Sequence, residues 1–205
     1  MMPTVSTLQQ AMDALVDRGY AVWPGFLDAE AVAGLLAEAR ARREAGAFHR
    51  AGVGRANGLA VRDQVRGDEV LWLDEAAEVA AERPYWQALQ ALRREINQTL
   101  YLGLVEGEFH YAHYPVGTFY RRHLDRFRDD DARTVSCVLY LNQDWQDAEG
   151  GQLRLYLDAT EESKFLDVSP QAGTLALFLS DRFWHEVLPA SRERWSVTGW
   201  MRRRV

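Results

Sequence analysis

A change in hydrophobic periodicity near residue 105 is the feature of this sequence that most constrains its fold. Before that point, apolar residues such as Leu89, Leu92 and Ile96 recur at spacings of three and four, which is typical of amphipathic helices. Beyond it, short segments rich in β-branched and apolar residues are separated by glycine turns. Because strands follow helices instead of alternating with them, we predict an α+β fold, mainly β, with antiparallel sheets. The predicted strands span 134–141, 152–157, 174–179 and 194–200.

Start and stop signals divide the first hundred residues into helices. Thr7 and Asp28 are good N-caps for two helices, and Gly19 can end the first of them. A third helix is expected to begin near Pro84. Tyr20–Trp23 resembles a short strand between the first two helices. We expect these N-terminal helices to pack on one sheet of the β core.

The length of 205 residues suits one domain. We predict a single domain over 1–205, in which 1–100 provide helical support and 105–202 form the β core. Within the first part, 46–68 carries several glycines and no clear periodicity. Structureless segments of this length are often lids or binding loops. We therefore expect this segment to close over a bound substrate.

Composition excludes several classes of function. The formal net charge of −6 argues against a nucleic-acid-binding surface. The single cysteine, Cys137, rules out an intrachain disulfide and a cysteine-based zinc site. No basic segment followed by an apolar run resembles a signal peptide, and no run of 18 apolar residues resembles a membrane span. We expect a cytoplasmic protein with no nucleic-acid or membrane partner.

Two histidines and one aspartate form a candidate metal site. In an extended strand, side chains at i and i+2 project from the same face, so His123 and Asp125 would be presented together. His185, on a neighbouring strand, would complete two nitrogens and one oxygen on one side of a metal ion. This set is associated with non-haem Fe(II) oxygenases. Because a His-x-Asp pair alone is a weak signal, Arg194 matters as a planar cation suited to a carboxylate of 2-oxoglutarate.

Several sequence blocks resemble one enzyme family. From about residue 20 to residue 202, the chain is similar to the 2-oxoglutarate- and Fe(II)-dependent prolyl 4-hydroxylases of the hypoxia-sensing type and their bacterial relatives. The order and spacing of the blocks match that family. The matching blocks are 65–72, 114–125, 133–145, 150–154, 180–182 and 185–194, continuing to Trp200.

The resemblance implies a fold and a set of site residues. The fold would be a double-stranded β-helix, the jelly-roll or cupin-like core, with N-terminal helices on one sheet. The implied iron ligands are His123, Asp125 and His185. The residues implied to hold 2-oxoglutarate are Arg194, Tyr140 and Tyr114. The residues implied to lie near the target residue are Arg133, Trp200 and Tyr120.

One of these residues conflicts with simple strand periodicity. Tyr140 and Ser136 share one face of the predicted strand, but the alternation puts Arg133 on the other face. A β-bulge or the end of the strand would have to redirect Arg133 toward the site.

The resemblance also implies an activity and a partner. We expect hydroxylation of a prolyl residue at C4 in a protein substrate, with release of succinate and CO2, and with ascorbate as an optional further cofactor. In the bacterial branch of the family, a proline of translation elongation factor Tu is a candidate target.

Alternative functions remain open from the sequence. The chain could hydroxylate a free amino acid or a non-proline residue, or it could be a catalytically silent binding module that keeps the barrel. A zinc hydrolase with the same three ligands is a further option, but it leaves Arg194 without a role.

Overall fold

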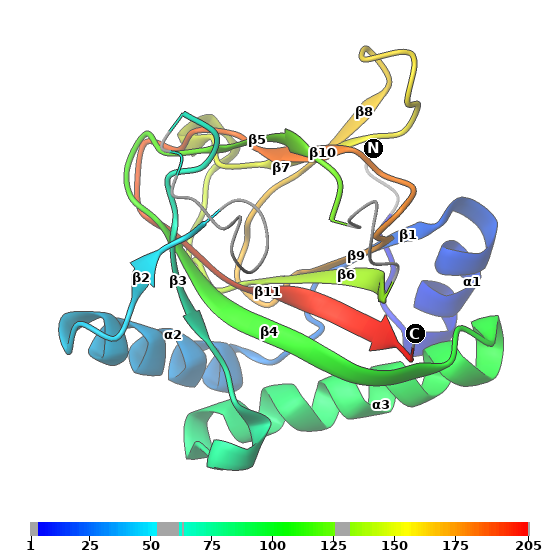
Figure 1. Ribbon diagram of the computed structural model, residues 1–205, viewed down its shortest axis with the longest axis horizontal. Coiled ribbons are helices and arrows are strands. Elements are labelled where there is room, and N and C mark those ends of the chain that lie inside the picture. The colour runs from blue at the N-terminus through cyan, green and yellow to red at the C-terminus, as the bar shows by residue number, and fades with distance from the viewer. Residues whose placement is uncertain (1–3, 53–61, 63, 126–131, 205) are drawn as a thin grey trace.

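The computed structural model describes residues 4–52, 62, 64–125 and 132–204. Two antiparallel sheets face each other (Figure 1). The large sheet has the order β1-β9-β6-β11-β4-β3-β2, and the small sheet has the order β5-β10-β7-β8. This is the arrangement predicted for a double-stranded β-helix.

Strands form most of the ordered core, and helices flank it. The large sheet contains β1 Tyr20–Trp23, β9 Leu175–Leu179, β6 Arg133–Tyr140, β11 Arg194–Arg203, β4 Leu104–Tyr114, β3 Glu69–Trp72 and β2 His49–Arg50. The small sheet contains β5 Tyr120–His123, β10 His185–Val187, β7 Leu153–Tyr156 and β8 Phe165–Val168. The α-helices are α1 Leu8–Arg18, α2 Ala29–Glu44 and α3 Arg83–Leu100, and the 3-10 helices are η2 Glu75–Ala77, η3 Ala80–Glu82 and η4 Asp147–Glu149.

The helix boundaries follow the predicted caps. The side chain of Thr7 accepts a hydrogen bond from the backbone of Gln10 at the start of α1, and Gly19 ends this helix with a left-handed φ of 82°. Asp28 caps α2, and Pro84 lies in the first turn of α3. None of the described helices has the length and apolar character needed to cross a lipid bilayer.

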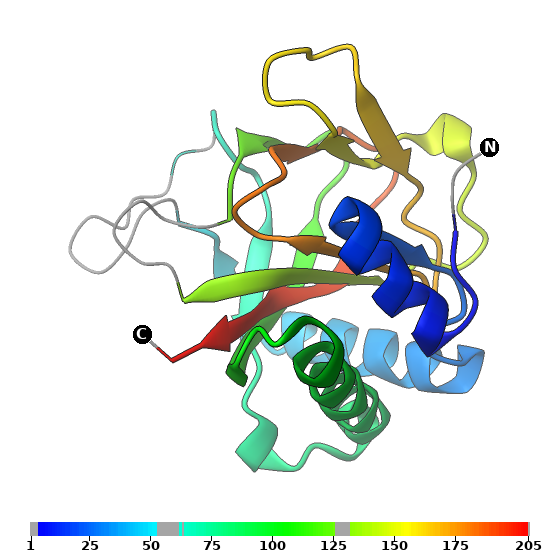
Figure 2. The same cartoon turned by 90° about the vertical axis from the view of Figure 1, so that its right-hand side faces the viewer.

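Two apolar clusters hold the layers together. One lies between the helices and the outer face of the large sheet, where Leu35 of α2 and Ile96 of α3 join Leu139 of β6. The other lies between the two sheets and includes Tyr140 and Leu155. In both views, α2 and α3 cover one side of the large sheet and the small sheet covers the other (Figure 1, Figure 2). The helices therefore pack on the face of the large sheet that is turned away from the small sheet, as we predicted from the sequence.

An irregularity in β6 gives Arg133 access to the interior. Met201 of β11 is opposite Val135, but the next residue, Arg202, is opposite Arg133. Thr134 is therefore the extra residue of a register shift. Because such a shift reverses the alternation beyond it, Arg133 turns toward the space between the sheets.

Candidate active site

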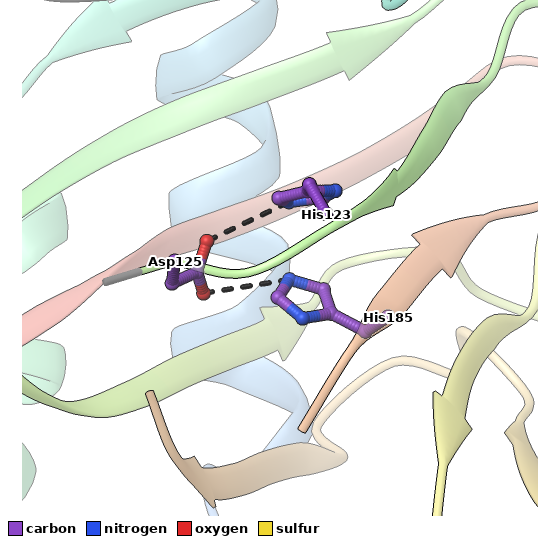
Figure 3. A group of neighbouring side chains, drawn as sticks. All are labelled: His123, Asp125 and His185. Carbon is purple, nitrogen blue, oxygen red and sulfur yellow. Dashed lines mark ion pairs between the residues drawn. The ribbon is translucent and has the colours of Figure 1, made fainter. Parts of the chain in front are cut away.

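Three side chains from two separate segments converge between the sheets. His123 ends β5, and His185 begins β10, directly opposite His123 in the register. Nε2 of His123 lies 3.5 Å from Oδ1 of Asp125, and Nε2 of His185 lies 3.4 Å from Oδ2. One possible ligand atom from each residue lies within 4.8 Å of the others, and the side chains point toward one another (Figure 3). The structure thus brings together the three residues expected to bind a metal ion.

The backbone orients both imidazoles. Nδ1 of His123 lies 2.8 Å from the carbonyl oxygen of Arg121, and Nδ1 of His185 lies 3.0 Å from that of Phe183. Because a carbonyl oxygen can only accept, each Nδ1 donates its proton. Each Nε2 then faces Asp125, and its lone pair is available to a metal ion once the ring is neutral.

Asp125 reaches the site in a different way from the one expected. The sequence placed it on the same strand as His123, and this is wrong, because β5 ends at His123 and Asp125 lies in the bend beyond it. Its Oδ2 accepts a 2.7 Å hydrogen bond from Oγ of Ser136 on β6. Ser136 Oγ also lies 2.9 Å from Oγ of Ser180. A hydrogen bond from the opposite sheet therefore positions the carboxylate, and the alternation of side chains along a strand does not.

The electrostatics of the three residues suit a divalent cation. Burial would raise the pKa of Asp125, but the charge of His185 and hydrogen bonds from both imidazoles hold it well below its ordinary value. Burial, with the neighbouring His185, lowers the pKa of His123. Burial opposes protonation of His185, but the Asp125 carboxylate outweighs it and raises the His185 pKa. The centre therefore offers an ionised carboxylate and two imidazoles, the donor set that divalent iron accepts.

The triad borders a cavity of about 380 Å³ between the two sheets. Several other residues that the sequence singled out also line this cavity. These residues are Tyr114, Tyr120, Arg133, Arg194 and Trp200. Tyr140 does not line the cavity, but Arg194 lies over its ring. From the 46–68 segment, 49–52 and Arg66 reach the cavity wall. Residues 53–61 and 63 lie outside the described part, so the expected lid role stays a prediction.

Arg194 is a buried cation in this cavity. Its exposure is 1%, its Nε donates to the carbonyl oxygen of Gly151 at 2.9 Å, and its guanidinium carbon lies 5.0 Å from the ring centroid of Tyr114 and 5.1 Å from that of Tyr140. Within the described part of the chain, its polar partners are the Gly151 carbonyl oxygen and the Ser196 hydroxyl, neither of them a carboxylate, and its Nη2 has no hydrogen-bond partner. A buried guanidinium without an anion is costly. The site therefore fits a ligand that carries a carboxylate.

The side chain of Tyr140 is a direct neighbour of the Arg194 guanidinium. Tyr140 is fully buried, and both the charge of Arg194 and a side-chain hydrogen bond with it act on its hydroxyl. Burial raises the pKa of Tyr140 to about 12, although the nearby charge of Arg194 opposes this shift. The hydroxyl is therefore a neutral donor at physiological pH. A second donor beside a guanidinium is well suited to one end of a dicarboxylate.

A stack of side chains supports His123 from the cavity side. The ring of Tyr120 lies 3.6 Å from that of His123, with the planes 15° apart. The guanidinium of Arg66 lies 4.2 Å from the centroid of the Tyr120 ring. Arg66 is in turn held by Asp68, with Nε 2.7 Å from Oδ1. The structure places Tyr120 against a candidate metal ligand, and its expected contact with substrate stays a prediction.

Arg133 and Trp200 form another part of the cavity wall. The guanidinium carbon of Arg133 lies 3.4 Å from the centroid of the Trp200 ring, and its Nε donates to Glu108 at 2.6 Å. The paired guanidinium and indole make a flat, partly apolar surface next to the triad. Such a surface can pack against the ring of a substrate residue.

Sequence reasoning missed His110 and Trp72 of the cavity wall. It also did not predict that the Arg66–Asp68 pair supports Tyr120. A usable signal existed for His110. It precedes Tyr114 by four residues on one strand, so both side chains project from the same face. No local signal placed Trp72 beside His110, because that contact depends on the β3–β4 register.

Comparison with known proteins agrees with this geometry. Residues 109–202 match the family model of the 2OG-Fe(II) oxygenase superfamily. The crystal structure of a Pseudomonas putida prolyl-4-hydroxylase is 47% identical, with a TM-score of 0.86, and the match covers 97% of this chain and 100% of that chain. The chain belongs to the prolyl hydroxylase family of 2OG-Fe(II) oxygenases. The resemblance found in the sequence is therefore confirmed, and Fe(II) and 2-oxoglutarate are the metal and co-substrate of this family.

More distant relatives extend the comparison. Human Egl nine homolog 1 is 35% identical over 143 residues, which cover 66% of this chain and 33% of that protein. A prolyl hydroxylase in complex with a hypoxia inducible factor oxygen degradation domain peptide fragment from Trichoplax adhaerens is 26% identical, with a TM-score of 0.84. That match covers 95% of this chain and 88% of the other. The chain therefore spans about a third of the human relative.

Proposed function

We propose that this chain is an Fe(II)- and 2-oxoglutarate-dependent prolyl 4-hydroxylase. It would oxidise C4 of a prolyl residue in a protein or peptide substrate and release succinate and CO2. One observation carries the proposal: a His-Asp-His triad and a buried guanidinium without a carboxylate partner in the described part of the chain border the same cavity. A zinc hydrolase would use the triad but not the guanidinium.

The roles of the residues follow from their contacts. Nε2 of His123, Nε2 of His185 and a carboxylate oxygen of Asp125 would hold Fe(II), which supplies the oxidising chemistry with dioxygen. Arg194 would bind the distal carboxylate of 2-oxoglutarate, with the hydroxyl of Tyr140 as a second donor. Tyr114 would line the same subsite.

The substrate is proposed to bind against the part of the cavity wall that Arg133 and Trp200 form. Arg133 and Trp200 would pack against the target prolyl ring, and Tyr120 would border it. The peptide complex of the Trichoplax adhaerens relative supports a peptide substrate. The match covers the whole length of the Pseudomonas putida enzyme, which supports the assignment of 1–205 to one dioxygenase domain. Because that relative is bacterial, it also supports the proposal of a bacterial protein target. A proline of elongation factor Tu in the cytoplasm is the first target that we propose to examine.

The test is a mass-spectrometric search for substrates. Cell-extract proteins, with purified elongation factor Tu in a parallel reaction, are incubated with the protein, Fe(II) and 2-oxoglutarate, with and without ascorbate. We expect a prolyl residue to gain one oxygen in step with succinate formation. The His185→Ala variant should produce neither change, because one of the three ligands is lost.

Each alternative function gives a different result. Oxygen gained by a free amino acid or by a non-proline residue would replace the prolyl assignment. If the protein binds Fe(II) but forms no succinate with any of the substrates tested, it is a catalytically silent binding module. Absence of Fe(II) binding in a titration would contradict the proposed function altogether.

A further inference from the structure

His110 lines the active-site cavity but has no role in the metal site or the 2-oxoglutarate site. It comes from β4, where Trp72 of β3 and Thr198 of β11 are its partners on either side. Its ring lies 4.8 Å from the Trp72 ring and 5.8 Å from the Trp200 ring. The two indoles thus fix the imidazole in the cavity wall, where its exposure is 4%.

The imidazole of His110 has an unused hydrogen-bonding atom. Its Nδ1 is buried and has no hydrogen-bond partner among the described residues. Buried polar atoms in native proteins nearly always have a partner, so a missing partner calls for an explanation. Nδ1 of His123 and of His185, by contrast, each bond to a backbone carbonyl.

The surroundings of His110 keep its ring neutral. Burial lowers its pKa to about 3, and the positive charges of Arg66 and Arg133 act in the same direction. A neutral imidazole has one N–H donor and one acceptor. Depending on the tautomer, the unpartnered Nδ1 can therefore either donate to a peptide carbonyl oxygen or accept from a peptide N–H. An anion could use only the donor form of this nitrogen, whereas a peptide group can use either form.

The strand register places His110 nearer to Trp200 than to Arg194 along the cavity wall. Along β11, Arg194 comes first, Thr198 pairs with His110, and Trp200 pairs with Ser136, which binds Asp125. Successive same-face residues along a strand are about 6.5 Å apart. His110 therefore lies two same-face positions from Arg194 but only one from Trp200, on the side proposed for the substrate.

We propose that His110 is a specificity residue that hydrogen-bonds a peptide group of the substrate chain next to the target residue. The inference rests on the proposed function, because it assumes that a peptide enters this cavity. Trp72 and Trp200 would act as its supports, and they hold the ring in one orientation before substrate binds. A free amino acid has no flanking peptide group and would not use this contact.

The test compares two substitutions at position 110. His110→Phe keeps a planar ring between the indoles but removes both nitrogens, and His110→Asn keeps a donor and an acceptor near the position of Nδ1. KM and kcat are measured with short synthetic peptides that each contain one proline, and binding of Mn²⁺ and 2-oxoglutarate is measured separately. We expect His110→Phe to raise KM about tenfold, the value of one net hydrogen bond. His110→Asn should recover most of this loss, with metal and 2-oxoglutarate binding unchanged in both.

A matched control comes from the same strand. His113 packs on Trp195 on the helix side of the sheet, with ring centroids 4.3 Å apart, and does not line the cavity. His113→Phe therefore disturbs β4 without touching the proposed contact. An equal rise in KM for His113→Phe, or an unchanged KM for His110→Phe, would overturn the proposal for His110 alone. If the wild-type protein oxidises a free amino acid and no peptide, the prolyl peptide assignment and the His110 contact both fail.

Discussion

Arg194 carries a buried charge and is also the residue proposed to bind 2-oxoglutarate. Its Nη2 has no hydrogen-bond partner among the described residues. Arg194→Met keeps much of the length and removes the charge. We expect the affinity for 2-oxoglutarate to fall at least 30-fold, because losing one member of a buried charge pair costs about 2–5 kcal/mol. In the absence of 2-oxoglutarate, the same variant should unfold at a higher temperature, because an uncompensated buried charge is gone. Titration calorimetry and thermal unfolding measure the two effects, and a loss of both affinity and stability would contradict this account.

Asp68 is connected to the candidate metal ligand His123 through two other side chains. Its carboxylate is buried against Arg66, which lies over Tyr120, which stacks on His123. Asp68→Asn would leave the buried Arg66 without a counter-charge and should cost about 3–5 kcal/mol of stability. Substitution of a group that orients a metal ligand typically lowers metal affinity 10- to 100-fold, so we expect Asp68→Asn to bind Mn²⁺ more weakly as well. Denaturant unfolding and a Mn²⁺ titration test this, with the exposed Asp17→Asn on α1 as control. Unchanged Mn²⁺ affinity would show that the stack does not orient His123.

At the scale of elements, the turn after η4 positions Arg194. Gly151 has a φ of 71°, and its carbonyl oxygen accepts the bond from Nε of Arg194. A Cβ here would lie 3.0 Å from a Trp145 ring carbon and from Cβ of Ala190, and 3.4 Å from Cδ of Arg194. Gly25 has the same φ, but a Cβ added there would meet no atom within 4 Å.

This pair of glycines gives a matched test. Gly25→Ala should lose about 1 kcal/mol, the cost of a left-handed backbone alone. Gly151→Ala should lose more and should also weaken 2-oxoglutarate binding, because the added methyl group displaces its neighbours. Urea unfolding and 2-oxoglutarate titration separate the two effects. Equal losses in both variants, with unchanged 2-oxoglutarate binding, would show that the turn does not position Arg194.

Local signals predicted the helices and most long strands, because caps and periodicity depend on residues close in the sequence. Thr7, Gly19 and Asp28 act as expected. The prediction that Asp125 lies on the same strand as His123 was wrong, because β5 ends at His123. Asp125 is held instead by a hydrogen bond from Ser136 on the opposite sheet, which sequence spacing does not reveal. His110 was missed for a similar reason, since its neighbour Trp72 is brought to it only by strand pairing. Spacing thus predicts which residues converge, and tertiary pairing decides how they are held.

On the scale of the whole molecule, one buried carboxylate joins the helical layer to the large sheet. Glu82 of η3 lies 3.6 Å from Nη2 of Arg42 on α2 and accepts a hydrogen bond from the hydroxyl of Tyr111 on β4 at 3.3 Å. Burial raises its pKa, although Arg42 opposes this. A carboxyl group with a raised pKa in the folded state stabilises the protein below its unfolded value, near 4.5, and this stability is lost as the pH rises through the folded value.

Glu82→Gln should therefore change how stability depends on pH. The amide can still accept the bond from Tyr111, and Arg42 keeps its contact with Glu38, 2.6 Å from Nε. We expect the variant to be more stable than the wild type near neutral pH, with the difference shrinking as the pH falls toward 4.5. Urea unfolding between about pH 4 and pH 8 measures this, with the exposed Glu44→Gln as control. A difference that grows toward acid pH would mean that the Arg42 ion pair outweighs burial, so that Glu82 fastens the helices to the sheet as a charged group.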